Sequence, residues 1–272
     1  MEKEVEENDL HMQVMLVTDD TFREHKGFDL ANFYDQQYSI SDLPVINVLE
    51  TDTFNDFKEI VAAKYEKQPQ QIRFWEYVNR QNKTLRPHEL ISPDNFNLTM
   101  VEICDKFTPH RSKPRFYLEI ANKPLDDEVW FPTTNEKFIV FLKFFDFHAQ
   151  TLECLGSLYV EKSGKVGDIY PILCEKKDLP PNTRLNLYEE IKPNMIIEMN
   201  PESTFCQSEI QNGDIICFQK ALTGKEIKEL FITVELLSNH LDAHLVWYPA
   251  SSIVDNGIDN DSSKMGFPLK FW

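Results

Sequence analysis

The sequence predicts an α+β protein of two successive units, each a mixed β-sheet packed on one main helix. The chain has 272 residues, about twice the usual length of one domain. Hydrophobic residues make up 42% of it and 20 residues are Phe, enough for two folded cores. The order strand, strand, helix, strand, strand also occurs twice, which predicts tandem β-grasp domains.

The first unit is predicted at residues 11–106, after a charged connector at 1–10 that we expect to enter from an upstream domain. Its expected strands are 12–17, 45–49, 72–78 and 100–103. A polar insertion covers about 20–43. The helix is expected after Thr53, because Thr53 and Asp56 have the spacing of a capping box and apolar residues then recur at helical intervals.

The second unit is predicted at residues 107–221, with 116–120 as an extra strand or connector at its start. Its expected strands are 138–145, 152–160, 185–188 and 214–218. The first two should form a hairpin. We expect its helix to begin near Asp168, so that Pro171 falls in the first turn, where proline is tolerated.

Beyond the second unit the pattern weakens. A helix is expected over residues 222–239, because apolar side chains recur there with the 3.6-residue period. Residues 240–272 are left without an assigned fold and are expected to be partly disordered, since polar and small residues dominate the stretch at 250–264.

Two patterns have both a functional and a structural interpretation. Phe74, Trp75 and Tyr77 could form an exposed aromatic docking stripe, but residues of this kind in a strand are more often core. His240 and His244 have an i, i+4 spacing that suits a metal ion. No Cys or Glu ligand lies near them, so a solvent-facing pair is favoured. The sequence therefore predicts neither a metal nor a cofactor.

Charge and cysteine content narrow the classes of function. The net charge is −17, with 45 acidic and 28 basic residues, and no dense basic stripe, so we expect no nucleic acid partner. An acidic surface instead favours partners rich in Lys and Arg. No apolar run reaches the roughly 18 residues of a membrane span, and no membrane association is expected. The five cysteines lack a CxxC pair, which suits the cytoplasm or the nucleus.

Several segments of the chain match one known family. The segments are 11–14, 71–75, 99–103, 141–143, 168–174, 187–194 and 213–220. In order and spacing they resemble the ubiquitin-like domains that follow the catalytic domain of the herpesvirus-associated ubiquitin-specific protease and its fungal relatives. The resemblance runs from about Leu10 to Leu237. It implies the first two of five such domains, with the helix that leads toward a third.

The resemblance also implies a binding site. In this family an acidic loop before the last strand of the second domain captures lysines of partner proteins. Glu209 and Asp214 match acidic positions of that loop, and Gly213 matches its glycine. Ser208 and Asn212 stand where better-known members have aspartate. We therefore expect these five residues to bind Lys-rich segments, although acids also flank turns simply because turns are polar.

The function implied is a non-catalytic module that docks partners and positions or regulates the protease domain, itself a second expected partner. A thiol protease needs a cysteine activated by histidine. Cys104, Cys154 and Cys217 are expected mid-strand between apolar neighbours, where burial raises a thiol pKa, and the family's cysteine and histidine boxes are absent.

Three alternatives stay open at this point. The domains could be only a spacer in an active deubiquitinase, or the chain could itself hydrolyse ubiquitin conjugates. A ubiquitin-like modifier is disfavoured, because the chain ends in Phe271 and Trp272 where conjugation requires a flexible Gly-Gly tail.

Overall fold

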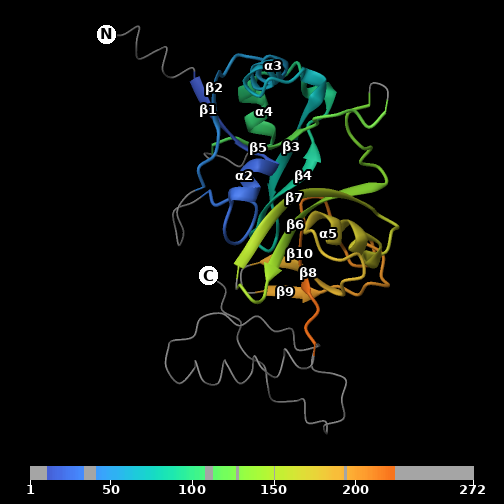
Figure 1. The fold of residues 1–272 in the computed structure, drawn as a ribbon. Helices are drawn as coiled ribbons and strands as arrows, with labels where there is room; N and C mark the ends of the chain where they lie inside the picture. The colour runs from blue at the N-terminus through green and yellow to red at the C-terminus, as the bar shows by residue number, and fades with distance from the viewer. Residues whose placement is uncertain are drawn as a thin grey trace, which may run out of the picture.

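The structure is a computed structural model that describes residues 11–33, 41–107, 113–126, 129–149, 151–192 and 195–223. These residues form two five-stranded sheets (Figure 1). The first contains β1 (His11–Val17), β2 (Val45–Leu49), β3 (Ile72–Asn79), β4 (Leu85–Leu90) and β5 (Arg115–Ile120). The second contains β6 (Lys137–Asp146), β7 (Thr151–Glu161), β8 (Leu185–Lys192), β9 (Met195–Glu198) and β10 (Ile215–Lys220).

Both sheets have the same topology. The strand order is β2-β1-β5-β3-β4 in the first sheet and β7-β6-β10-β8-β9 in the second. The central strand of each runs parallel to the first strand and antiparallel to the third. Two mixed sheets with this order confirm the predicted tandem β-grasp fold.

The main helix of the first unit, α3 (Phe54–Lys64), begins where the capping box predicts. The Thr53 hydroxyl accepts a hydrogen bond from the Asp56 amide at 3.1 Å, and the Asp56 carboxylate accepts one from the Thr53 amide at 3.0 Å. Phe54 and Phe57 on its inner face pack with Phe74 on β3 in the first core. In Figure 1 this helix lies at the end of the first unit farthest from the second.

The prediction of a strand at 100–103 is wrong. This segment begins the helix α4 (Met100–Phe107), and a second capping box explains why: Glu102 accepts from the Thr99 amide at 2.8 Å. The strand that completes the first sheet is β5, which pairs with both β1 and β3. The first unit therefore extends to Ile120, and the boundary predicted after residue 106 falls one strand too early.

The second unit follows the sequence more closely. β6 and β7 form the predicted hairpin. A 3-10 turn, η3 (Val166–Ile169), leads into α5 (Tyr170–Lys176), so Pro171 lies in the first turn as predicted. The edge strands β4 and β9 were not predicted. The remaining short helices are α2 (Asp19–Glu24), η1 (Pro69–Gln71) and η2 (Pro93–Asn95).

The two sheets pack against each other through the faces that their helices leave open. Because strand side chains alternate between faces, Phe74 lies in the first core while Trp75 and Tyr77 point the other way. There they join a third cluster that also contains side chains of the second unit. Tyr117 meets Phe141 across this contact in an edge-to-face pair with ring centroids 4.9 Å apart. The aromatic stripe is thus core, as favoured, and the core is shared by both units.

Some predictions lie outside the described residues. These are the connector at 1–10, the helix at 222–239 beyond residue 223, the tail at 240–272 and the pair of His240 and His244. Among the residues that the structure describes, no helix is both long and apolar enough to cross a membrane.

Candidate functional site

The predicted acidic loop lies just before β10, and its five residues fall into two groups. Glu209 is exposed and Ser208 is half-buried at the outer end of the loop. Asn212 is half-buried, while Gly213 and Asp214 are buried, all three against the first unit. The outer end of the loop is therefore exposed to solvent, while its inner end packs against the first unit.

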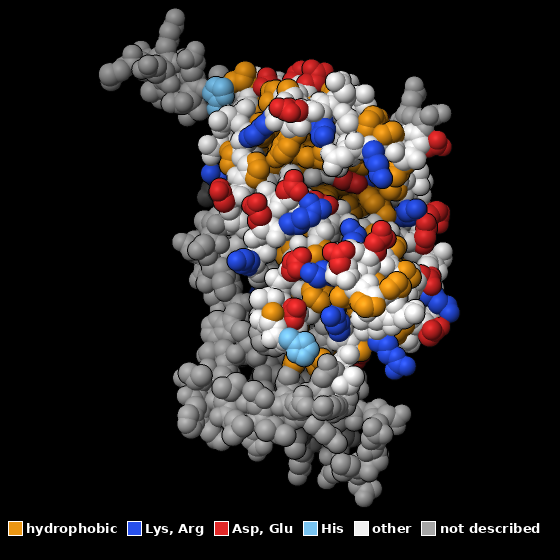
Figure 2. Space-filling view, viewed as in Figure 1, with side chains coloured by type: hydrophobic (Ala, Val, Ile, Leu, Met, Phe, Trp, Pro, Cys, Tyr) orange, Lys and Arg blue, Asp and Glu red, His pale blue; other side chains and the backbone are white. Residues whose placement is uncertain are grey.

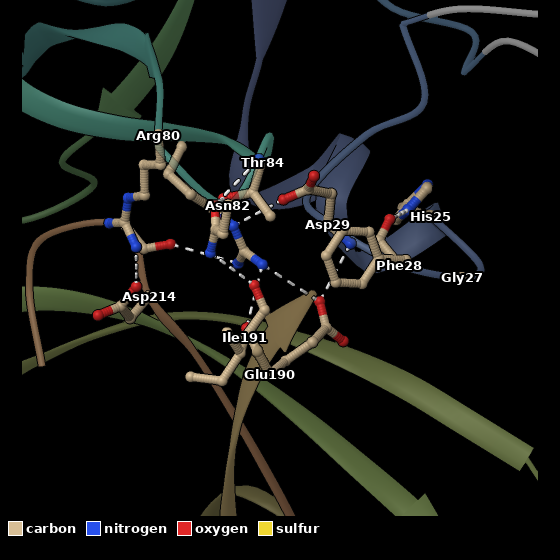
Figure 3. Close-up of polar contacts among 12 residues, drawn as sticks. His25, Gly27, Phe28, Asp29, Arg80, Asn82, Thr84, Glu190, Ile191 and Asp214 are labelled. Atoms are coloured by element: carbon tan, nitrogen blue, oxygen red, sulfur yellow. Dashed lines mark hydrogen bonds and ion pairs between the residues drawn. The ribbon is translucent and has the colours of Figure 1, made fainter. Parts of the chain in front are cut away.

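Both carboxylate oxygens of Asp214 accept hydrogen bonds from other residues of the chain. Arg80, just after β3, forms an ion pair with Oδ1, and the Gln211 amide donates to Oδ2 at 2.7 Å. A second guanidinium nitrogen of Arg80 donates to the Asn212 carbonyl at 2.6 Å. Figure 3 shows Arg80 directed at Asp214. The Asp214 side chain is only 4% exposed, so Arg80 from the first unit neutralises this acidic position.

Asn212 and Gly213 hold the loop against the β4 strand of the first unit. The side-chain amide nitrogen of Asn212 donates to the His88 carbonyl at 3.0 Å, and its side-chain oxygen accepts from the backbone amide of Ile139 at 3.1 Å. Gly213 has φ of +83°, a backbone conformation that glycine adopts without strain. A Cβ at this position would lie 2.2 Å from the Pro87 carbonyl oxygen. Only glycine allows the two backbones to approach this closely.

A buried network of charged groups lies deeper in the same interface (Figure 3). The Lys143 ammonium, 0% exposed, donates to Glu190 at 2.8 Å and to the Gly27 carbonyl at 2.8 Å. Arg86, 1% exposed, forms an ion pair with Asp29 at 2.7 Å and donates to the Glu190 carbonyl at 3.2 Å. Asp29 comes from the insertion of the first unit. Each of these two ion pairs lies within one unit, and the contact of Arg86 with Glu190 joins them across the interface, with carboxylate and guanidinium 3.6 Å apart.

This network was not predicted from the sequence, although the sequence contains one signal of it. Lys143 lies in the middle of an otherwise apolar strand, between Leu142 and Phe144. A lysine in the middle of a hydrophobic strand is almost never fully buried unless its charge is paired. The missing information was the partner, since Glu190 is 47 residues away in sequence.

Glu189 adds a further acidic group beside the loop. Burial, and then the charge of Asp214, raise the pKa of Glu189 to about 7, with Glu209 contributing in the same direction and Arg80 and Arg86 opposing it. Glu189 is half-buried on β8, and its carboxylate has less cationic compensation than that of Asp214. Among the described residues, neither Glu189 nor Glu209 forms an ion pair, in contrast to Asp214.

Glu189→Gln should make the stability of the chain less dependent on pH. A pKa raised from 4.5 to about 7 means that the folded state binds the proton more tightly, so this group stabilises the fold below pH 4.5 and loses that contribution as pH rises through 7. At pH 8 the variant should be more stable than the parent by roughly 1–2 kcal/mol, a value discounted for partial solvent exposure. Urea unfolding at pH 5 and pH 8 measures this difference.

The control is Glu175→Gln, a change of the same kind at an exposed position on α5. It should leave the difference between the two pH values unaltered. An equal response of both variants would show that Glu189 carries no special proton affinity.

Three of the cysteine thiols, those of Cys104, Cys154 and Cys217, are poor nucleophiles, as predicted from their apolar surroundings. Burial raises the pKa of Cys104 and of Cys154 to about 11, and it raises the pKa of Cys217 further. Cys154 and Cys217 lie in strands as expected, but Cys104 lies in the helix α4. Within the part of the chain that the structure describes, no group of three or more His, Cys, Asp or Glu side chains could hold a metal ion.

Comparison with known proteins identifies the family. The model of the ICP0-binding domain of Ubiquitin-specific protease 7 matches residues 72–245. Ubiquitin carboxyl-terminal hydrolase 5 of Schizosaccharomyces pombe is 38% identical over 220 residues, covering 80% of this chain and 20% of that protein. Ubiquitin C-terminal hydrolase 13 of Arabidopsis thaliana is 30% identical over 222 residues, with the same two shares. The chain thus spans about a fifth of the length of these relatives.

One solved structure with similarity is the C-terminal ubiquitin-like domain of mouse tubulin-specific chaperone e. It is 14% identical and covers 34% of this chain and 95% of its own, with a TM-score of 0.27. Because this score is low, the fold is assigned from the strand order of the two sheets. The family match extends over more than half of the chain, and the chain therefore belongs to the family of the ICP0-binding domain of ubiquitin-specific protease 7.

Proposed function

We propose that the chain is a non-catalytic module of a ubiquitin-specific protease that docks Lys-rich segments of partner or substrate proteins at the acidic loop and positions or regulates the protease domain. One observation carries this proposal: the loop already binds a cationic side chain, Arg80, through the Asp214 carboxylate and the Asn212 carbonyl. The carboxyl groups of Glu189 and Glu209 beside it, which have no ion-pair partner among the described residues, offer a second place for a cation.

The packing of the two sheets supports a loop as the docking site. The open faces of both β-grasp units are used in the contact between them, through residues such as Trp75 and Tyr188. Loops, helices and sheet edges remain for partners. On the face shown in Figure 2, Lys and Arg side chains are interspersed with Asp and Glu over both units and form no continuous basic surface there. With a net charge of −17, a cationic partner suits this surface.

We place the hydrolysis of ubiquitin conjugates outside this chain, in a protease domain elsewhere in the same protein. The high thiol pKa of Cys104, Cys154 and Cys217 supports this view. All five cysteines are free, which suits the reducing conditions of the cytoplasm or nucleus that we propose as its location. The alternative is a spacer without docking. One observation supports it: the core shared by the two units fixes their relative position.

The experiment is a calorimetric titration of the whole chain with a Lys-rich peptide at low and high salt. The proposal expects binding that weakens with salt. Glu209→Lys should weaken binding by roughly threefold to tenfold, because it replaces an attractive ion pair at the exposed end of the loop with a repulsive one. Turnover of a fluorogenic ubiquitin substrate, measured in parallel, tests the placement of catalysis.

The matched control is Glu59→Lys, which changes the net charge equally. Glu59 is exposed on α3, which covers the face of the first sheet opposite to the second unit. This variant should bind the peptide nearly as well as the parent. An equal loss in both variants would trace binding to net charge alone, and no binding at either salt would favour the spacer.

A further inference from the structure

We infer that Arg80 is an internal competitor for partner lysines at the acidic loop and thereby sets which segments the module binds and how tightly. This inference rests on the proposed function. Arg80 contacts Asp214 and Asn212, two of the five residues expected to meet a partner. It therefore occupies a position where a partner's ammonium group would otherwise bind.

The guanidinium is held in this position by the turn between β3 and β4. The Arg80 amide donates to the Thr84 carbonyl at 2.9 Å and closes the turn. The Asn82 side chain accepts from the Thr84 hydroxyl at 2.7 Å and donates across the interface to the Ile191 carbonyl at 2.9 Å. Figure 3 shows Asn82, Thr84 and Arg80 together above the second unit. Arg80, whose side chain is 18% exposed, is thus a fixed interface group.

Arg80 is the more exposed member of the pair, at 18% against 4% for Asp214. Its Nε is buried and has no hydrogen-bond partner among the residues that the structure describes, so the guanidinium uses only part of its donor capacity there. The neighbouring Glu189 and Glu209 would attract an approaching ammonium group. A lysine that arrives there meets Asp214 already neutralised, and only the outer part of the loop stays anionic.

Removal of the guanidinium should therefore strengthen partner binding. Without Arg80, the Asp214 carboxylate and the Asn212 carbonyl are left without their cation in a buried position. A peptide lysine can supply that charge, and the penalty of the unpaired carboxylate is then relieved on binding. A purely structural role for Arg80 predicts the opposite, because loosening the interface would disturb the loop and weaken binding.

The test compares the whole parent chain with Arg80→Gln and Arg80→Gln/Asp214→Asn in titrations with a Lys-rich peptide at two salt concentrations. Arg80→Gln should bind about fivefold or more tightly than the parent, with a steeper dependence on salt. The double variant lacks the uncovered carboxylate and should return to an affinity near that of the parent. The peptide should also raise the thermal stability of Arg80→Gln more than that of the parent.

Two further variants complete the design. Arg184→Gln removes the same charge at an exposed position just before β8, at the end of the β8–β10 pair opposite to the loop. This variant should leave affinity close to that of the parent. Arg80→Lys keeps the charge, but a single ammonium group cannot contact Asp214 and Asn212 with two separate nitrogens as the guanidinium does. The lysine should therefore compete less well with the peptide, and this variant should bind the peptide slightly more tightly than the parent. It also provides the answer if Arg80→Gln does not fold.

Each outcome decides between the proposals. Unchanged or weaker binding by Arg80→Gln and Arg80→Lys, with a parent that binds, overturns the role of Arg80 and leaves the docking loop intact. An equal gain in Arg184→Gln would assign the effect to net charge and overturn it as well. If neither the parent nor the Arg80 variants bind the peptide, docking at the loop fails together with this inference.

Discussion

Glu190→Gln is expected to lower the free energy of unfolding by about 3–5 kcal/mol, the cost of leaving one partner of a buried ion pair uncompensated. Glu190 is the anion that contacts the Lys143 ammonium, and both groups lie in the interface with side-chain exposures of 7% and 0%. The substitution preserves shape but removes the charge, so Lys143 stays buried as a cation. Urea unfolding followed by tryptophan fluorescence measures the loss, since Trp75 lies in the same interface.

Two comparisons separate this effect from a general loss of packing. The double variant Glu190→Gln/Lys143→Met removes both charges and should recover much of the lost stability, because an apolar replacement of a buried pair is often neutral. Glu161→Gln breaks the exposed pair with Lys137 and should change stability by less than about 1 kcal/mol. Equal losses in Glu161→Gln and Glu190→Gln would contradict the assigned role of the buried network.

Gly213→Ala is expected to destabilise the chain by about 2–4 kcal/mol and to loosen the contact between the units. Two costs add in this variant: an L-residue is strained at φ of +83°, and the new Cβ would lie 2.2 Å from the Pro87 carbonyl oxygen. Backbone atoms cannot yield as a side chain can, so the loop and β4 must separate. Urea unfolding and limited proteolysis between residues 120 and 137 report the two consequences.

Gly27→Ala is the matched control, because Gly27 also has a positive φ, +121°, but no atom within 4 Å of its added Cβ. It pays the backbone cost without the collision. The difference between the two variants therefore measures the close approach of the two units. Losses of the same size would mean that the approach at Gly213 contributes nothing beyond its backbone conformation.

The sequence was sufficient for the fold where a local rule had a single solution. The capping box at Thr53 and the two successive runs of strand-forming residues at 138–145 and 152–160 each point to one kind of element, and both predictions are confirmed. The segment at 100–103 failed because a short apolar run suits either a helix or a strand. Thr99 and Glu102 carried the deciding signal, since together they form the capping box that begins α4.

The site was predictable only in part, for a different reason. The positive φ of Gly213 follows from its own identity and setting, so it could be predicted. The pairing of Asp214 with Arg80 could not, because these residues are 134 positions apart and belong to different units. The spacing of apolar residues along a strand does not show which sheet face will pack against another sheet. Whether a charge faces solvent or another domain is therefore decided beyond the range of local sequence rules.

The core shared by the two sheets has a consequence for how related chains can diverge. Tyr117 and Phe141 touch across the boundary between units, so a change in the volume of one ring must be matched in the other. The same holds for Arg80 with Asp214, where each charge lies in a different unit. The two units are thus expected to change together. In a chimera that takes its first unit from this chain and its second from a relative, the side chains on the two sides of the interface would not fit each other.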